Sequence, residues 1–182
     1  RPSVGAEVKI MDLDGKELPR GEVGEIWVKS DTNMIGYYNL PEATASSLTD
    51  GWVHTGDAGY MDEAGYLYLK DRIKDMVVSG GENIYPVEVE NAIAHHEAVA
   101  DVAVIGVPDE KFGEALLAFV VLQPDKALEL EEMIEFCRER IAGYKIPRKL
   151  EIIEEMPRNP SGKILKKELR KPFWEGVERN IG

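Results

Sequence analysis

The chain has 182 residues, of which 43% are hydrophobic and 31% are charged, a composition typical of one folded domain or two small ones. Its net charge of −12 argues against a nucleic-acid-binding protein, and no window approaches 18 consecutive apolar residues, so we expect neither a membrane span nor a signal peptide. The single cysteine excludes an internal disulfide, and with the other features it predicts a cytoplasmic protein.

Residues 1–70 are predicted to be β-rich. Alternating polar and apolar side chains and Gly- or Pro-marked turns predict strands at residues 7–10 and 24–29, a short helix at residues 41–48, and a two-stranded hairpin at residues 53–69. The hairpin turn falls at Asp62–Gly65, and Asp57 stands at the head of the hairpin. Since the first strands have no obvious central partner and Arg1 follows no cap or strand, we expect the chain to be cut from a longer protein.

Residues 71–75 join the two halves of the chain. Four charged residues flank Ile73 there, which suits a solvated joint. The apolar run 76–78 is soon followed by Gly80-Gly81, two glycines that permit positive φ and let another molecule approach the backbone closely. We interpret this stretch as a candidate ligand edge; an ordinary loop before a helix is the alternative.

The second half alternates helices and strands, which indicates a compact α+β layer. The periodicity predicts helices at residues 87–96, 130–141 and 165–170, and strands at residues 99–107, 115–123 and 149–154. Residues 116–122 are apolar throughout, so we expect a small sheet covered by helices rather than an open sandwich. Cys137 lies on the apolar stripe of its helix, which predicts a buried core thiol and not a nucleophile.

Charge is distributed unevenly along the chain. From Gly143 to Gly182 there are ten Lys and Arg against six Asp and Glu, a local charge of +4, which leaves −16 for residues 1–142. A basic end on an acidic chain is either a solvated amphipathic terminus or a small electropositive surface for a phosphorylated ligand. The sequence leaves both alternatives open.

Five motifs in a fixed order give the chain a family resemblance over essentially its whole length. They are GYYNLPEAT at residues 36–44, DGWVHTGD at 50–57, DRIKD at 71–75, SGGENIYPVEVE at 79–90 and PRNPSGKILKKELR at 157–170. The chain resembles the C-terminal third of an AMP-forming acyl-CoA synthetase, a member of the acyl-adenylate-forming superfamily. The resemblance implies three parts: a β-rich end of the large domain at residues 1–70, a hinge at residues 71–75, and a mobile α+β domain at residues 76–182.

The resemblance also implies a two-step reaction. A carboxylic acid attacks the α-phosphate of ATP, which gives an acyl-adenylate and pyrophosphate, and the thiol of coenzyme A then captures the acyl group. The phosphate loop, the adenine-binding segment, the magnesium carboxylate and the acyl pocket of this family would all precede Arg1. We therefore expect the missing N-terminal part of the same protein as a partner, a Mg²⁺ site outside this chain, and no activity from the chain alone.

Two residues of the first half match the nucleotide-binding positions of the family. The resemblance implies that Asp57 accepts hydrogen bonds from both ribose hydroxyls, and the alternative is an aspartate that caps a turn. Arg72 is implied to help hold the same nucleotide, because its planar fork of donors suits ribose or phosphate oxygens. A surface ion pair of Arg72 with Asp71 or Asp75 is the alternative.

Two lysines match positions with a role in the reaction cycle. Lys163, on a glycine-containing loop, is implied to be catalytic, because its ammonium can bridge the attacking carboxylate and the α-phosphate where charge accumulates. One more solvated lysine in a basic tail is the alternative. Lys74 matches the hinge position, where many relatives carry Asp, and around which the small domain swings between an adenylating and a thioester-forming pose.

The resemblance implies a coenzyme A site at six positions: Gly80, Gly81, Glu82, Phe112, Tyr144 and Arg148. The glycine edge would line a tunnel for the pantetheine arm, and the aromatic and basic residues would contact the nucleotide end. Some relatives carry a second basic residue at the position of Ile146, so the phosphate is held more weakly here or by Lys145 and Lys149. The three histidines match no catalytic position, and no metal site is expected within the chain.

The acid and the acceptor are less specified than the reaction. The ending ELRKPFWEGVERNIG resembles medium- and long-chain fatty acyl-CoA ligases, and the SGGEN loop favours coenzyme A over a carrier protein. An aryl-CoA ligase, or another acyl-adenylate-forming enzyme, is the alternative. From a different class, a non-catalytic interaction module that kept the fold but not the chemistry also remains open.

Overall fold

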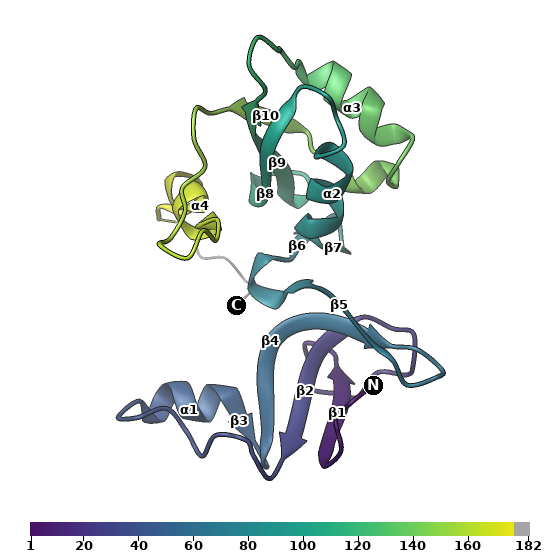
Figure 1. The fold of residues 1–182 in the computed structure, drawn as a ribbon, viewed down its shortest axis with the longest axis vertical. Coiled ribbons are helices and arrows are strands. Elements are labelled where there is room, and N and C mark those ends of the chain that lie inside the picture. Colours follow the sequence, from purple (N-terminus) through teal and green to yellow (C-terminus); the bar gives the residue numbers. More distant parts are fainter. Residues whose placement is uncertain (177–182) are drawn as a thin grey trace. The chain divides into compact units, whose positions relative to one another are not determined.

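A computed structural model describes residues 1–176 of the chain. The chain divides into two compact units, Arg1–Lys74 and Asp75–Gly182. Each unit contains its own sheet of five strands (Figure 1). The expected α+β class is confirmed, because both sheets are combined with helices. Within the described part, no helix is both long and apolar enough to cross a bilayer.

The first unit is built around a long central strand. Its elements are β1 (Ala6–Met11), β2 (Gly24–Ser30), α1 (Pro41–Ser47), β3 (Leu48–Thr49), β4 (Trp52–Met61) and β5 (Leu67–Arg72). The strand β4 pairs antiparallel with β2, β3 and β5, and β1 pairs antiparallel with β2. The expectation that the first strands lack a central partner was therefore wrong: β4 is that partner.

The core of the first unit is small. It consists of Ile10, Ile26 and Met61, with a few partly buried neighbours such as Val28. Gly59 of β4 is required by close packing, since a Cβ there would lie 2.4 Å from the backbone oxygen of Tyr68. The sheet is thus held largely by backbone pairing and by one thin apolar layer.

The second unit has a mixed sheet with helices on both faces. Its strands are β6 (Val77–Ser79), β7 (Glu82–Ile84), β8 (Val99–Asp109), β9 (Gly113–Leu122) and β10 (Lys149–Ile152). Its helices are α2 (Pro86–Ile93), α3 (Leu130–Arg138) and α4 (Lys166–Trp174), and the short 3₁₀ turns are η1 (Ile73–Asp75), at the boundary between the units, and η2 (Gly143–Lys145). The strand β9 pairs antiparallel with β8 and parallel with β10.

Alternate residues of β9 enter two different apolar clusters. Leu116 and Val120 pack with residues of α2 and α3, whereas Leu117 and Phe119 pack with Leu169 of α4. Figure 1 shows α2 and α3 on one side of β8 and β9 and α4 on the other. The continuous apolar run of this strand is therefore buried on both faces, as the sequence predicted.

Several element boundaries differ from those expected. The hairpin of β6 and β7 was not predicted, because two strands of three residues are too short for alternation to show. Helix α3 ends at Arg138, before the expected Ile141. Helix α4 runs past the expected end to Trp174, whose Nε1 donates a hydrogen bond to the backbone oxygen of Gly106 at 3.0 Å and fixes the helix end against β8.

Cys137 is fully buried in the larger cluster of the second unit. Its predicted place in the core is confirmed. Burial raises the pKa of the Cys137 thiol, because the thiolate loses hydration there, so the nucleophilic form is disfavoured.

Candidate active site

Asp57 and Arg72 lie directly opposite each other on β4 and β5. The Nε atom of Arg72 is 3.0 Å from Oδ1 of Asp57, and the two side chains remain 53% and 35% exposed. Asp57 lies within β4, the first strand of the predicted hairpin, and the turn begins at Asp62, as predicted. Both side chains of the Asp57–Arg72 ion pair are still partly accessible to another molecule.

The alternative partners proposed for Arg72 are engaged elsewhere. Oδ1 of Asp71 accepts a hydrogen bond from the backbone N–H of Arg72 at 2.7 Å. The carboxylate of Asp75 pairs with Arg170 of α4 and is largely buried, so residues 71–75 are not a wholly solvated joint. The ion pair of Arg72 is made with Asp57, which is the other predicted nucleotide residue.

The backbone around Asp57 is shaped by an irregularity in the pairing of β2 and β4. Between the pairs Glu25–Ala58 and Trp27–His54 the register shifts, because β4 has three residues, 55–57, where β2 has one, so the bulge is in β4. Gly56 has φ of 69°, which only glycine adopts without strain. The hydroxyl of Thr55 donates to the backbone oxygen of Ile26 at 2.7 Å and accepts the N–H of Asp57 at 3.1 Å.

Glu25 completes this arrangement from β2. Its Oε1 accepts the N–H of Gly56 at 3.0 Å, and its Oε2 accepts the indole N–H of Trp27 at 2.8 Å. The carboxylate therefore ties the bulged Gly56 peptide to β2 and holds the residue that precedes Asp57. Sequence reasoning missed Glu25, since a glutamate in an alternating strand is usually only a solvent-facing residue.

The predicted glycine edge is the exposed turn between β6 and β7. Gly80 and Gly81 have φ of 61° and 88°, and Glu82 begins β7 with its side chain exposed. The N–H of Gly80 donates to the backbone oxygen of Phe112 at 2.9 Å. A Cβ on Gly80 would lie 3.3 Å from the Phe112 ring, so this glycine allows a close approach of the two segments. The structure brings Gly80 and Phe112 together, as their shared predicted role requires.

Arg148 covers the other side of Phe112. Its Cζ lies 4.1 Å from the centre of the Phe112 ring, a cation–π contact. The loop that presents Phe112 is held by Asp109, whose Oδ1 accepts the N–H groups of Phe112 and Lys111 at 3.0 Å each. These backbone hydrogen bonds, chiefly that from Phe112, hold the pKa of the Asp109 carboxyl below its usual value.

The remaining coenzyme A candidates are placed separately. Tyr144 lies in η2 and is 48% exposed. Lys145 forms an ion pair with Glu88, whose carboxylate oxygens lie 2.6 and 2.8 Å from Nζ of Lys145. Lys145 is therefore not a free cation that could bind the phosphate where Ile146 replaces a basic residue. Ile146 is buried in the core, whereas Lys149 is exposed at the start of β10.

Lys163 lies at the end of a tight loop. The loop is closed by the N–H of Asn159, which donates to the backbone oxygen of Lys163 at 2.9 Å, and by Oδ1 of Asn159, which accepts the N–H of Lys163 at 2.9 Å. The side chain of Lys163 is exposed, and no carboxylate among residues 1–176 forms an ion pair with it.

Other cations of the basic end are neutralised within the second unit. The pairs are Lys145 with Glu88, Arg158 with Asp101, Lys166 with Glu90, and Arg170 with Asp75. These four cations are partners of acidic residues earlier in the chain. The exposed Lys149, Lys163 and Lys167 form no ion pair within residues 1–176, so for them a solvated end and a phosphate-binding surface both stay open. Lys163 differs from the four paired cations, since no carboxylate of the described chain holds its ammonium.

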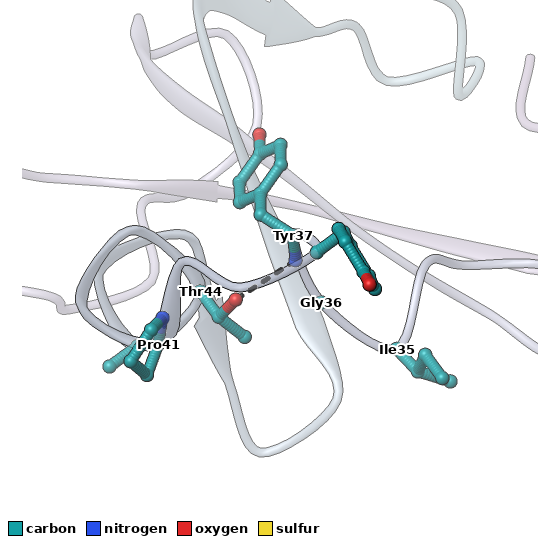
Figure 2. Close-up of a pocket in the computed structure, with 7 residues that line it drawn as sticks. Ile35, Gly36, Tyr37, Pro41 and Thr44 are labelled. Carbon is teal, nitrogen blue, oxygen red and sulfur yellow. Dashed lines mark hydrogen bonds between the residues drawn. The ribbon is translucent and has the colours of Figure 1, made fainter.

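A further hollow lies in the first unit, in the first of the five motifs. It is lined by Ile35, Gly36, Tyr37, Tyr38, Pro41, Thr44 and Ala45. The N–H of Tyr37 donates to Oγ1 of Thr44 at 2.9 Å, which fixes the loop against α1 (Figure 2). None of the predicted site residues lines it.

The described residues offer no metal centre. Among residues 1–176, no three His, Cys, Asp or Glu side chains gather in a way that would hold a metal ion. The Mg²⁺ site expected outside this chain stays a prediction about the rest of the protein.

Comparisons with known proteins place this geometry in a family. Residues 88–163 match the model of the AMP-binding enzyme C-terminal domain. They belong to that domain family. The match begins within α2, includes the central strands β8 and β9, and ends at Lys163.

The similarity extends beyond this AMP-binding C-terminal domain. The chain is 46% identical over 180 residues to the fatty acid–acyl-carrier-protein ligase ScoC of Streptomyces coeruleorubidus, covering 99% of this chain and 35% of that protein. It is 46% identical over 179 residues to the long-chain-fatty-acid–CoA ligase FadD13 of Mycobacterium tuberculosis, covering 98% and 35%. The structure of o-succinylbenzoate CoA synthetase (MenE) from Bacillus subtilis, in complex with its acyl-adenylate intermediate, matches with a TM-score of 0.85 and 43% identity, covering 93% and 34%.

The chain spans about a third of the length of these curated relatives. The resemblance to the C-terminal part of an AMP-forming acyl-CoA synthetase is confirmed. The related proteins carry both fatty-acid and aryl-acid names, so they support an acyl- or aryl-activating ligase family without selecting an acid. The roles of the individual site residues, and the domain boundaries with the hinge at residues 71–75, stay predictions.

Proposed function

We propose that this chain is the C-terminal part of an ATP-dependent acid–thiol ligase that activates a fatty acid as its acyl-adenylate and transfers the acyl group to coenzyme A. The observation that carries the proposal is the state of Lys163. It is exposed and free of any ion pair among the described residues, while four nearby cations in sequence are paired with carboxylates. A free ammonium on a closed loop is suited to an anionic reacting group.

In the first step, a carboxylate oxygen of the acid attacks the α-phosphorus of ATP. The bond between that phosphorus and the bridging oxygen to the β-phosphate breaks, and pyrophosphate leaves with the electron pair. The Lys163 ammonium stabilises the negative charge that builds up on the attacking and phosphoryl oxygens. Asp57 accepts the ribose hydroxyls through the carboxylate oxygen that Arg72 does not hold, and the outer nitrogens of Arg72 donate to the same nucleotide.

In the second step, the thiol of coenzyme A loses its proton and its sulfur attacks the acyl carbonyl, and AMP leaves. The exposed turn of Gly80 and Gly81 provides backbone without side chains for the pantetheine arm, and Glu82 borders it. The stacked Phe112 and Arg148 provide an aromatic face and a cation for the nucleotide end.

The two steps need different surfaces of the second unit. Lys163 serves the first, and the Gly80-Gly81 turn serves the second, so we propose that the unit swivels about Lys74 within residues 71–75. We assign Tyr144 to the surface for the second step, because its position matches a coenzyme A contact of the family. A cytoplasmic location and the missing N-terminal part as the partner belong to the same proposal.

The acceptor and the acid each have a specific rival. The ScoC relative is named for transfer to an acyl carrier protein, which makes a carrier-bound thiol the second candidate acceptor. The MenE structure is named for an aryl acid, which makes an aryl-CoA ligase the second candidate activity. A non-catalytic module is favoured only if no acid is activated.

The test uses the full-length protein with ATP, a panel of fatty and aromatic acids, and either coenzyme A or an acyl carrier protein. We expect pyrophosphate release with fatty acids, thioester formation on coenzyme A, and no turnover by the 182-residue chain alone. Preference for aromatic acids would select the aryl-CoA ligase. Failure to release pyrophosphate with any carboxylic acid would remove the enzymatic proposal.

A further inference from the structure

The Lys163 loop is a small closed hairpin on the surface of the second unit. Arg158 and Ile164 form an isolated antiparallel bridge, and the N–H of Leu165 donates to the backbone oxygen of Pro157 at 2.7 Å. Ile164 packs partly buried against the apolar cluster that contains Met156. The base of the hairpin is thus fixed by packing, while residues 160–163, which form the turn and end with Lys163, are exposed.

The peptide unit that joins Gly162 to Lys163 is held at both of its polar groups. The N–H of Lys163 donates to the Asn159 side chain at 2.9 Å. The carbonyl oxygen of Gly162 accepts a hydrogen bond from Nη1 of Arg158 at 2.5 Å. Because a peptide unit is planar, fixing its oxygen and its N–H fixes the plane that carries Cα of Lys163. The carbonyl oxygen of Lys163 is held as well, by the N–H of Asn159 at 2.9 Å, and together these bonds set the direction in which the side chain leaves the backbone.

Arg158 is itself attached to the central sheet. Its Nη2 lies 2.5 Å from Oδ2 of Asp101, on β8, and the other oxygen of Asp101 accepts the N–H of Val102 at 3.0 Å. One planar guanidinium therefore bridges the loop carbonyl and a carboxylate whose orientation is set by the strand. Lysine has one terminal nitrogen on a flexible stem and lacks this fixed fork, so it holds the two acceptors less rigidly.

We propose that Arg158 is a positioning residue for acyl-adenylate formation: by joining the Gly162 carbonyl to Asp101, it holds the Lys163 ammonium in its reactive direction. The inference rests on the proposed role of Lys163. Gly162 has φ of 83° and no side chain to restrict it, so the peptide unit pivots more freely once the Arg158 bond is lost. A displacement of about 1 Å at a catalytic group can cost about a hundredfold in rate.

A merely structural role for Arg158 makes a different prediction. The ion pair with Asp101 lies at the surface, with side chains 43% and 30% exposed, where such pairs contribute little to stability. Loss of Arg158 should therefore change the first half-reaction far more than the melting temperature. It should also leave the second half-reaction intact, because the proposed thioester surface is on another loop.

The experiment compares three variants of the full-length enzyme, Arg158→Gln, Arg158→Lys and Asp101→Asn, with a matched control. Arg140→Gln is that control, because Arg140 also donates to a backbone carbonyl, that of Phe136 at 2.7 Å, and lies 3.4 Å from a carboxylate, that of Glu139. Pyrophosphate release measures acyl-adenylate formation, and thioester yield from supplied acyl-adenylate measures the second step. A thermal melt measures stability.

We expect Arg158→Gln to slow acyl-adenylate formation by about tenfold to a hundredfold, with thioester formation and melting temperature close to those of the wild type. Arg158→Lys should recover part of the loss, because it restores one charged donor. Asp101→Asn should weaken the attachment in the same direction, and combining it with Arg158→Gln should add little, since both act through one bridge. Arg140→Gln should resemble the wild type in every assay.

A second measurement does not depend on activity. In the 182-residue chain, hydrogen exchange of the Gly162 and Lys163 amides should be faster in Arg158→Gln than in the wild type, and unchanged in Arg140→Gln. Unchanged exchange at these amides would contradict the clamp.

The outcomes separate the inference from the proposed function. A wild type that releases no pyrophosphate overturns the proposed function and the catalytic part of this inference together. An active wild type with Arg158→Gln indistinguishable from Arg140→Gln overturns the inference alone. An equal loss in both half-reactions, accompanied by a lower melting temperature, would show Arg158 to be structural and likewise overturn it.

Discussion

The two units hold their candidate site residues in different ways. In the first, Asp57 and Arg72 lie on paired strands above a core of three buried residues, so their relative position is set by strand register and by polar contacts such as that of Glu25. In the second, the Gly80-Gly81 turn and the Lys163 loop project from a unit whose described residues, 75–176, form apolar clusters of fifteen and seven buried side chains. A larger core fixes the position of the short loops that carry site residues, whereas above a thin core the position of the site residues depends on backbone pairing.

Each unit should therefore depend on its own core for stability. A substitution in one core is expected to loosen the strands around it and to leave the other unit protected. A substitution at an exposed site residue is expected to change the reaction while both cores stay intact.

The largest effect is expected from a cavity in the second core. Leu117→Ala removes a side chain that is 1% exposed and should lower the free energy of unfolding by about 2 to 5 kcal/mol. Hydrogen exchange should accelerate in β8 and β9 but not in β1 and β2. Ile26→Ala, at a position 2% exposed in the first unit, is the reciprocal variant. Loss of protection across both units from either change would show that they unfold as one body.

The next largest effect is expected on the rate of acyl-adenylate formation. In the full-length enzyme, Lys163→Ala should slow acyl-adenylate formation by about a hundredfold to a thousandfold, because one electrostatic contact in the transition state is lost. Thioester formation from supplied acyl-adenylate should be nearly unchanged, which the two half-reaction assays test. Lys167→Ala, a neighbouring exposed lysine, is the control. Equal losses in both half-reactions would assign Lys163 to folding or domain closure.

A smaller effect is expected from the strand-held site of the first unit. Asp57→Asn keeps the shape of the side chain but removes its charge, and charge-assisted hydrogen bonds contribute about 1.5 to 3 kcal/mol. The KM for ATP should therefore rise by about tenfold to a hundredfold, measured by pyrophosphate release against ATP concentration.

The matched control for that change is Asp62→Asn on the same hairpin. Asp62 accepts the N–H of Tyr66 at 2.8 Å and the hydroxyl of Tyr68 at 3.2 Å, and the N–H of Tyr66 chiefly lowers its pKa. Its loss should weaken the turn and leave the KM for ATP unchanged. Equal effects of the two variants on KM would mean that Asp57 acts through the hairpin fold rather than through the nucleotide.

The parts of the structure that sequence predicted are those with dense local signals. The apolar run of β9 and the stripe that buries Cys137 depend on neighbours in sequence, and both were confirmed. The hairpin β6–β7 was missed because its strands are too short to show a period.

Ion pairs between residues far apart in the sequence were not predicted either. Arg158 meets Asp101 across 57 positions, and Arg170 meets Asp75 across 95, so nothing local distinguishes these cations from solvated ones. Register was hidden as well: a bulge between Ala58 and Gly59 intervenes in the pairing of β4 and β5, so that counting along the hairpin does not place Asp57 opposite Arg72. Motif resemblance indicated the candidate residues, whose roles stay predictions, and only the folded chain showed what holds them in place.

The smallest expected effect is a pH-dependent change in stability that comes from the loop presenting Phe112. The pKa of Asp109 is lowered because its carboxylate accepts the N–H groups of Phe112 and Lys111. A carboxyl with a depressed pKa in the folded state adds stability above its ordinary value of 3.8, and this contribution is lost as the pH falls through the lower folded value. Asp109→Asn should therefore be slightly less stable than the wild type at neutral pH, and this difference in the free energy of unfolding should narrow on acidification below pH 3.8.

Urea unfolding of the 182-residue chain at neutral pH and below pH 3.8 measures this difference. Asp125→Asn, at an exposed position of the same unit, is the control. A stability difference that stays constant or widens in acid would show that the Phe112 loop does not depend on the charge of Asp109. The loop would then be held by the packing of Gly80 and Arg148 against the Phe112 ring.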